Sequence, residues 1–291
     1  MKEYTEKEHY ISQFIIRNFT DEYGKVRVIN KTKEPIEMYS SSPAKLFYSC
    51  NLYETRNNDG TYFDRNAIEK DFAVFEGALS KELPQIIKQA DENKKLSCYQ
   101  IKCLADLVAF QLVRLPFIRK FLFDSNNNIT DNTERKLQTN AMYRIVIDSP
   151  ESGFSYLENN AFSLSENAKN RIRETKANTA VYEFINNECN IYLIKAEEYS
   201  FCIGDFPVLI DVFTNAKYIF PISPKFAIVC SLTESNDAEE YNTIRYVKRD
   251  MVSFINEKII EKAERFIVFN HSDEAYMLGE VQKALRGMKR V

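Results

Sequence analysis

The first apolar stretch of the chain carries a narrow polar stripe. Residues 9–19, HYISQFIIRNF, combine Tyr, Ile and Phe with His9, Gln13 and Arg17, which recur every four positions. On a helix, the apolar side chains would spread over roughly 240° of the circumference and the three polar ones would share roughly 80°. The pattern predicts a largely buried helix whose polar stripe is either a solvent-exposed edge or part of a functional site.

A second segment is apolar almost all the way round a helix. Residues 104–116, LADLVAFQLVRLP, predict a central core helix on which Gln111 and Arg114 lie one turn apart. A buried arginine keeps its charge, so its burial is costly unless an anionic group or a full set of acceptors surrounds it. Arg114 is therefore expected either to form an internal bridge to Asp or Glu or to face a ligand.

The remaining periodicity divides the chain into three parts. Two pairs of short strands are expected before residue 64, and residues 64–92 predict a helix that Pro84 should kink or restart. Further helices are expected at about 97–123, 131–148 and 164–187. From residue 190, short β-branched and aromatic runs predict an antiparallel sheet, followed by a helix at 250–264, a strand and a final helix at 273–287.

These elements predict an α+β fold. Its helical middle would lie between small N-terminal strands and a C-terminal antiparallel sheet with terminal helices. We expect one domain over residues 1–291, with sub-regions at 1–63, 64–188 and 189–291.

Two polar positions among the C-terminal strands need an explanation. Asp205, in CIGDFPVLI, is expected either to cap a turn or to stand at a strand end, where functional sites often lie. In FNHSDEAY, Ser272 or Asp273 is the expected helix cap, which leaves His271 a weaker candidate than His9. Buried polar groups require partners, so we expect the N-terminal stripe, the core helix and Asp205 to meet at one site.

Composition removes several classes of function. The chain has 44% hydrophobic residues, 28% charged residues and a net charge of −3, which is typical of a soluble globular protein without a global field for nucleic acid. Seven glycines provide no phosphate-cradling loop, which argues against most ATPases and dehydrogenases, and two histidines exclude a histidine-rich zinc site. We expect no membrane span, a cytoplasmic location and six reduced core cysteines.

Four motifs in order, HYISQFIIRNF, FQLVRLP, GDFPV and FPISP, resemble those of domain of unknown function 4238, a family found in bacteria and their phages. The resemblance covers most of the chain. It implies that the family's recurrent polar positions correspond to His9, Gln13, Arg17, Asn18, Gln111, Arg114, Asp205 and Pro207. The chain departs from the family at Ser12, where proline is usual, and at Gly204, where Ser or Thr often precedes the acid. The second departure would remove a hydroxyl from the site.

Two classes of function are compatible with these residues. In the first, the protein binds a phosphate-containing anion, as a phosphodiester or nucleotide hydrolase would. His9 and Asp205 would then be catalytic, and Gln13, Arg17, Asn18, Gln111 and Arg114 would bind substrate. His9 would transfer a proton, and Asp205 would orient it or hold a metal, although no metal site is assigned. In the second class, the polar cluster is a structural network in a non-enzymatic protein-binding factor linked to bacterial or phage defence or counter-defence.

The sequence leaves the partners of the chain open. An anionic small molecule, a nucleic acid and a protein are all compatible with it, whereas a membrane is not expected. Cofactors, the reaction and the oligomeric state are not indicated by any motif.

Overall fold

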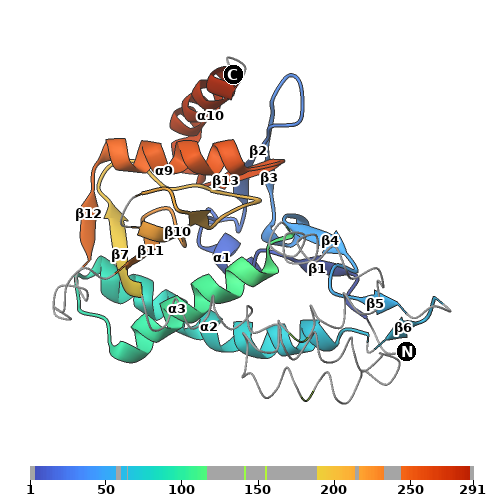
Figure 1. Ribbon diagram of the computed structural model, residues 1–291. Helices are drawn as coiled ribbons and strands as arrows, with labels where there is room; N and C mark the ends of the chain where they lie inside the picture. Colours follow the sequence, from blue (N-terminus) through green and yellow to red (C-terminus); the bar gives the residue numbers. More distant parts are fainter. Residues whose placement is uncertain are drawn as a thin grey trace.

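A computed structural model describes residues 4–56, 60–63, 65–116, 141, 155, 189–213, 216–232 and 244–288 (Figure 1). Apart from residue 141, the helices expected at 131–148 and 164–187 lie outside the described residues.

The predicted α+β class is confirmed. The helices are α1 (Gln13–Arg17), α2 (Ala67–Asp91), α3 (Cys98–Arg114), α9 (Arg249–Lys262) and α10 (Glu274–Met288), with short 3-10 turns η1 (Pro43–Lys45) and η4 (His271–Asp273). The strands before α2 are β1 (Lys7–His9), β2 (Val26–Asn30), β3 (Glu37–Ser41), β4 (Tyr48–Cys50), β5 (Thr55–Arg56) and β6 (Tyr62–Phe63). Those after α3 are β7 (Cys189–Ala196), β8 (Ile203–Gly204), β9 (Leu209–Ile210), β10 (Ala216–Pro221), β11 (Phe226–Leu232), β12 (Arg245–Val247) and β13 (Phe266–Phe269).

The larger sheet is buried on both faces. Its strand order is β12-β7-β11-β10-β9, and α9 lies on the opposite side of it from α2 and α3 (Figure 1). In β11, Ile228 and Cys230 belong to the core cluster that includes α2 and α3, whereas Ala227 and Val229 belong to the cluster that includes α9. This alternation follows from the two-residue period of a strand.

The C-terminal sheet is antiparallel, as expected, except at one edge, which makes it a mixed sheet. Strand β12 pairs with β7 in parallel, with Arg245 opposite Ile194. In addition, β8 does not belong to this sheet and pairs instead with β13. Short apolar runs indicate that strands form, but the direction of each pairing depends on contacts far along the chain.

A second sheet joins the two ends of the chain. Its order is β3-β2-β13-β8, so the N-terminal hairpin pairs with C-terminal strands. The two expected N-terminal strand pairs are present as β2–β3 and β5–β6, but β2 also pairs with β13, so the first hairpin belongs to a sheet that includes C-terminal strands. Val28 of β2 lies opposite Val268 of β13, and both are fully buried.

The N-terminal apolar segment is only partly helical. Residues 7–9 form β1, and the helix expected over 9–19 is reduced to α1, Gln13–Arg17. The backbone N–H of Tyr10 donates to the carbonyl of Phe47 at 2.9 Å, which extends the β1–β4 ladder past His9. The predicted burial is nevertheless correct for Ile11, Ile15, Ile16 and Phe19, which are all fully buried.

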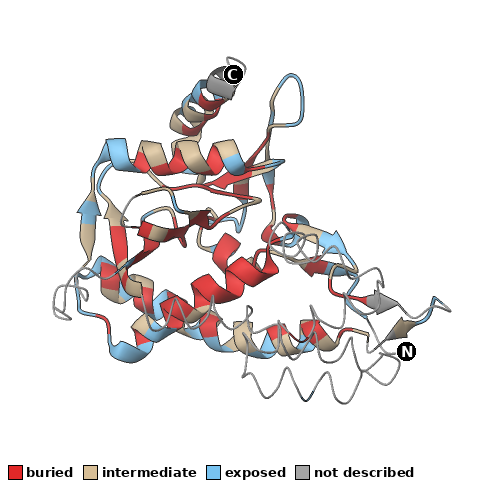
Figure 2. Ribbon diagram, in the orientation of Figure 1, coloured by how far each residue is buried: buried red, intermediate tan, exposed pale blue. Residues whose placement is uncertain are grey.

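Helices α2 and α3 differ from the expectation in length. Helix α2 continues through Pro84 rather than restarting, and Pro84 lies on its exposed side, where solvent can satisfy the carbonyl that loses its donor. Helix α3 begins with a capping box between Ser97 and Gln100 and is almost entirely buried (Figure 2). It ends before Leu115, which is extended because a residue preceding proline avoids the helical region.

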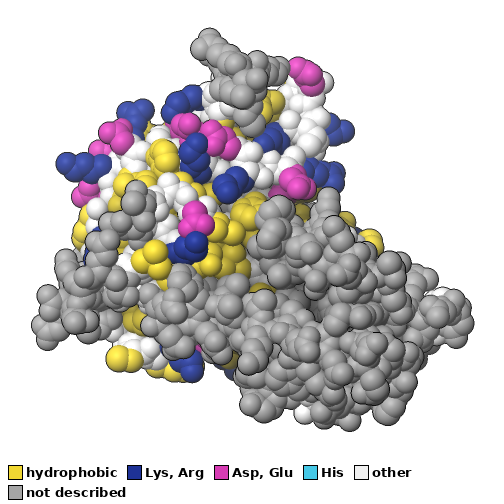
Figure 3. Space-filling model, in the orientation of Figure 1, with side chains coloured by type: hydrophobic (Ala, Val, Ile, Leu, Met, Phe, Trp, Pro, Cys, Tyr) yellow, Lys and Arg dark blue, Asp and Glu magenta, His cyan; other side chains and the backbone are white. Residues whose placement is uncertain are grey.

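The remaining expectations concern cysteines, caps and surface charge. All six cysteines are free, but Cys50 and Cys98 are exposed rather than in the core. The turn before α10 is capped by Asn270, whose side chain accepts from the Ser272 N–H at 3.1 Å, rather than by Ser272 or Asp273. On the described part of the face in Figure 3, basic and acidic side chains are interspersed. None of the described helices is long and apolar enough to cross a membrane.

Candidate functional site

Arg114 lies at the C-terminal end of α3 and is only 2% exposed. Its Nη1 donates to Ser12 Oγ at 2.9 Å and to the carboxylate of Glu76, and its Nη2 donates to the carbonyl oxygen of His9. Its Nε donates to the Tyr53 hydroxyl at 3.3 Å. Every guanidinium nitrogen therefore has a protein partner, which corresponds to the internal-bridge alternative.

The surroundings of Arg114 keep it charged. Burial acts to lower its pKa, but Tyr53 and Glu76 outweigh burial and raise the pKa above its usual range. The rings of Phe72 and Phe110 also face the guanidinium, with centroids 4.6 Å and 4.9 Å from Cζ. The arginine is thus a fixed, fully partnered cation that joins α3 to α2 and to the N-terminal segment.

Three more carboxyl groups surround this network. Glu8 Oε2 accepts from the Tyr53 N–H at 2.6 Å, and Glu54 Oε1 accepts from the N–H of Asn66 at 2.7 Å. Burial raises the pKa of Glu8 to about 8 despite its hydrogen bond from Tyr53, and the nearby Glu54 raises it further. Burial also raises the pKa of Glu69 to about 7. Glu8 is therefore mainly protonated at neutral pH.

Sequence reasoning missed these acids. On α2, Glu69 and Glu76 are seven residues apart, two turns of helix, beside the apolar positions Ile68, Phe72 and Leu79. Carboxylates bordering an apolar stripe at that spacing were the available signal, and they include the acid that Arg114 requires.

The N-terminal stripe consists of His9, Gln13 and Arg17, whose side chains are connected one to the next. Arg17 Nη2 donates to Gln13 Oε1 at 3.3 Å, and Gln13 Nε2 lies 3.4 Å from His9 Nδ1. Burial, followed by the charge of Arg114, lowers the pKa of His9, so its ring is neutral at pH 7. If Gln13 donates to Nδ1, the ring proton is on Nε2, which is a buried atom. Only Arg17 is exposed.

Tyr10 connects the core helix with the turn that contains Asp205. Gln111 Nε2 donates to the Tyr10 carbonyl oxygen at 2.7 Å. Burial raises the pKa of the Tyr10 phenol, and the Asp205 carboxylate raises it further. The three elements expected to meet are thus in contact through residues 9–12, but Arg114 and Gln111 bind that segment itself and are closed to solvent.

Asp205 organises the start of β13. Its Oδ2 accepts from the backbone N–H of Phe266 at 2.9 Å and from that of Arg265. Burial raises the pKa of Asp205, although its hydrogen bonds from Phe266 and Arg265 act to lower that pKa. This geometry corresponds to the turn-cap alternative.

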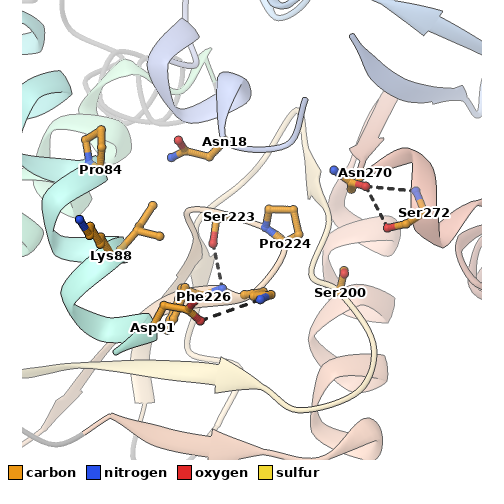
Figure 4. Close-up of a pocket in the computed structure, with 12 residues that line it drawn as sticks. Asn18, Pro84, Lys88, Asp91, Ser200, Ser223, Pro224, Phe226, Asn270 and Ser272 are labelled. Carbon is orange, nitrogen blue, oxygen red and sulfur yellow. Dashed lines mark hydrogen bonds and ion pairs between the residues drawn. The ribbon is translucent and has the colours of Figure 1, made fainter. Parts of the chain in front are cut away.

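A separate groove of about 560 Å³ lies between the C-terminal half of α2, the end of α1 and the β10–β11 turn (Figure 4). It is lined by Asn18, Pro84, Ile87, Lys88, Asp91, Ser200, Ser223, Pro224, Lys225, Phe226, Asn270 and Ser272. Of the polar residues singled out from the sequence as site candidates, Asn18 lines this groove, whereas His9, Gln13, Arg17, Gln111, Arg114 and Asp205 do not.

The groove has an excess of positive charge at one end. Asp91 Oδ1 lies 2.9 Å from Lys195 Nζ and 3.9 Å from Lys225 Nζ. The hydrogen bond from Lys195 lowers the pKa of Asp91, which keeps it ionised. Lys88, on the same wall, forms no ion pair with any described residue. Two ammonium groups, those of Lys195 and Lys225, therefore lie within 4 Å of a single carboxylate.

Hydrogen bonds fix the polar side chains of the groove. Asn18 Nδ2 donates to the Ile222 carbonyl at 2.8 Å, and Ser223 Oγ accepts from the Phe226 N–H at 3.0 Å. The Ser223 hydroxyl hydrogen is left to donate elsewhere. Asn18 was among the residues expected to bind substrate, and Ser223 lies in the FPISP motif, but the sequence did not indicate that the two residues line one groove.

The described residues contain no group of three or more His, Cys, Asp and Glu side chains that could hold a metal ion. Glu8 and Glu54 accept hydrogen bonds from backbone N–H groups, and Glu76 is paired with Arg114.

Comparison with known families defines the class of protein. Residues 7–273 match the model of a family of unknown function, DUF4238. The match spans most of the chain, so the chain belongs to this family. Comparison with curated proteins and with solved structures returned no match.

Proposed function

We propose that the protein binds a phosphate-containing anionic small molecule in the groove between α2, α1 and the β10–β11 turn. The observation that carries the proposal is that Lys195 and Lys225 both lie within 4 Å of the single carboxylate of Asp91, while Lys88 lines the same groove. Lys88 and Lys225 supply charge, and Ser223 supplies a hydroxyl donor. Charge-assisted hydrogen bonds of this kind are the strong ones in anion recognition.

The size of the groove supports the same proposal. Pockets of about 300–1,000 Å³ are typical of organic small-molecule sites, and the groove lies within that range. Polar side chains converge on it from three segments far apart in the sequence, at Asn18, Lys88 and Ser223.

The proposal is for binding and not for hydrolysis. The neutral ring of His9 could accept a proton, but His9 does not line the groove, and Asp205 holds backbone N–H groups elsewhere. A phosphodiester or nucleotide hydrolase would need a base beside the bound phosphate.

Calorimetric titration with inorganic phosphate and pyrophosphate tests the proposal. We expect saturable binding that weakens by about tenfold when either groove lysine is replaced, in Lys88→Met or Lys225→Met, because each removes one charge-assisted hydrogen bond. Lys102→Met is the matched control, since Lys102 is an exposed lysine on α3 outside the groove. Equal weakening in all three variants would indicate unspecific charge attraction.

A non-enzymatic protein-binding factor, linked to bacterial or phage defence, is the second candidate. It is favoured by one observation: Arg114 and Gln111 hold the N-terminal segment and do not face an open cleft. If the folded protein binds neither phosphate nor pyrophosphate, this candidate becomes the better one.

A further inference from the structure

We infer that the ligand of the groove is a phosphate ester whose organic part donates a hydrogen bond to Asn18, so that Asn18 determines specificity. This inference rests on the proposed function and adds the class of ligand and the direction in which it lies. The inference depends on a chemical difference between the two ends of the groove. One end carries lysine ammonium groups, and the other carries the amide oxygen of Asn18.

The lysine end is suited to the phosphate. Lys225 Nζ lies 3.9 Å from Asp91 Oδ1, and Lys88 lines the same end of the groove. In Figure 4, Ser223 lies between Asp91 and Asn18. The carboxylate of Asp91 lies within 4 Å of both Lys195 and Lys225, so one negative charge faces two ammonium groups. A phosphate dianion is stabilised where positive charge exceeds negative charge.

The Asn18 end is suited to a donor and not to a phosphate. Because Asn18 Nδ2 donates to the Ile222 carbonyl, the orientation of the amide is set. No described residue donates to Asn18 Oδ1, which leaves this carbonyl oxygen as an acceptor on the groove wall. An acceptor repels phosphate oxygens, whereas a hydroxyl or amino group of a ligand can donate to it.

The wall between the two ends is largely apolar. Pro84, Ile87 and Pro224 line it, and Ile87 and Pro224 are only partly buried in the free protein. An organic body in contact with these side chains would remove apolar surface from water at about 25 cal/mol per Å². The volume of 560 Å³ is also far larger than the ~30 Å³ that one water molecule occupies, so a small inorganic ion alone would leave most of it to solvent.

Asn270 is the control residue for testing the role of Asn18. It lines the same groove, but its Oδ1 accepts from Ser272 N and Ser272 Oγ, and its Nδ2 donates to the Thr20 carbonyl at 3.4 Å. Both ends of its amide are therefore occupied by the protein. Asn18→Ala and Asn270→Ala remove the same side chain from one groove, but only the first removes a free acceptor.

The test compares three esters with inorganic phosphate by calorimetry on the full chain. Ribose 5-phosphate and adenosine 5′-monophosphate carry donor groups on their organic part, whereas phenyl phosphate does not. We expect the two donor-bearing esters to bind at least tenfold more tightly than phenyl phosphate, and phenyl phosphate to bind more tightly than inorganic phosphate. Asn18→Ala should abolish the difference between donor-bearing esters and phenyl phosphate without changing the affinity for inorganic phosphate, and Asn270→Ala should preserve it.

Thermal melts verify that both variants are folded, since Asn18→Ala also removes the bond to Ile222. The inference is overturned if all esters bind no more tightly than inorganic phosphate, or if the two variants reduce ester affinity equally. If inorganic phosphate itself does not bind, the proposed function fails together with the inference.

Discussion

At the scale of single residues, the polar side chains within apolar stretches divide into two groups. Arg114, Gln111 and Asp205 form hydrogen bonds to other parts of the protein and do not line the groove, whereas Asn18 and Lys88 do line it. Sequence patterns identify a polar group in an apolar segment but not the partner that satisfies it. For Arg114 that partner is Glu76, which lies 38 residues earlier in the sequence.

Arg114→Leu should lower the free energy of unfolding by about 3–5 kcal/mol. The change leaves Glu76 without its buried cationic partner and the His9 carbonyl without a donor. Chemical denaturation measures this loss. Arg17→Leu is the matched control, because Arg17 is exposed and bonded only to Gln13, and it should change stability by less than about 1 kcal/mol. Equal effects of the two changes would contradict a structural role for Arg114.

Stability should fall as the pH rises from about 4.5 to about 8. The folded pKa of Glu8 is raised from 4.5 to about 8, so over this interval the unfolded chain releases a proton that the folded chain retains. Glu69, raised to about 7, acts in the same direction. Melting temperatures measured across this range should decline less in Glu8→Gln, whose side chain stays neutral and can still accept from Tyr53. An identical decline in the variant would show that Glu8 ionises normally.

At the scale of elements, local periodicity predicts what forms within one segment. The helix expected at 250–264 is α9, and the final helix expected at 273–287 is α10, because both carry a regular apolar face against the core. The N-terminal segment differs because residues 7–9 pair with residues 48–50, a contact that no local pattern reveals. Likewise, nothing within β2 indicates that it pairs with β13.

Gly204 occupies its position because the packing of two elements leaves no room for a side chain. A Cβ there would lie 2.8 Å from the Cβ of Ala263, at the end of α9. The sequence expectation that glycine removes a useful hydroxyl therefore has a packing alternative: in this chain, Ala263 fills that space.

Gly204→Ser should destabilise the protein by about 1–3 kcal/mol, the usual cost of overpacking. The double variant Gly204→Ser, Ala263→Gly should recover part of this loss, because it removes the methyl group that a serine would meet. Gly279→Ser is the control, since a Cβ at Gly279 meets nothing within 4 Å. Denaturation midpoints that are the same for Gly204→Ser and for the double variant would contradict close packing at this contact.

At the scale of the whole molecule, the groove is a product of the tertiary fold. It is built from the end of α1, the second half of α2, the β10–β11 turn and the residues around η4 (Figure 4). These segments are far apart in the sequence and individually resemble ordinary caps and turns. The α+β class and the family could be predicted from the chain, whereas the groove could not, because its chemistry exists only once these segments are adjacent.

Two-dimensional NMR of the amide-labelled protein during titration with inorganic phosphate tests the central claim most directly, because it locates the bound anion. We predict saturable shifts of the backbone amides at residues 222, 223, 225 and 226 and at residues 87–91, and no saturable shifts at residues 9–17. Saturable shifts confined to His9, Gln13 and Arg17, or the absence of any saturable shift, would contradict the assignment of the groove as the anion site.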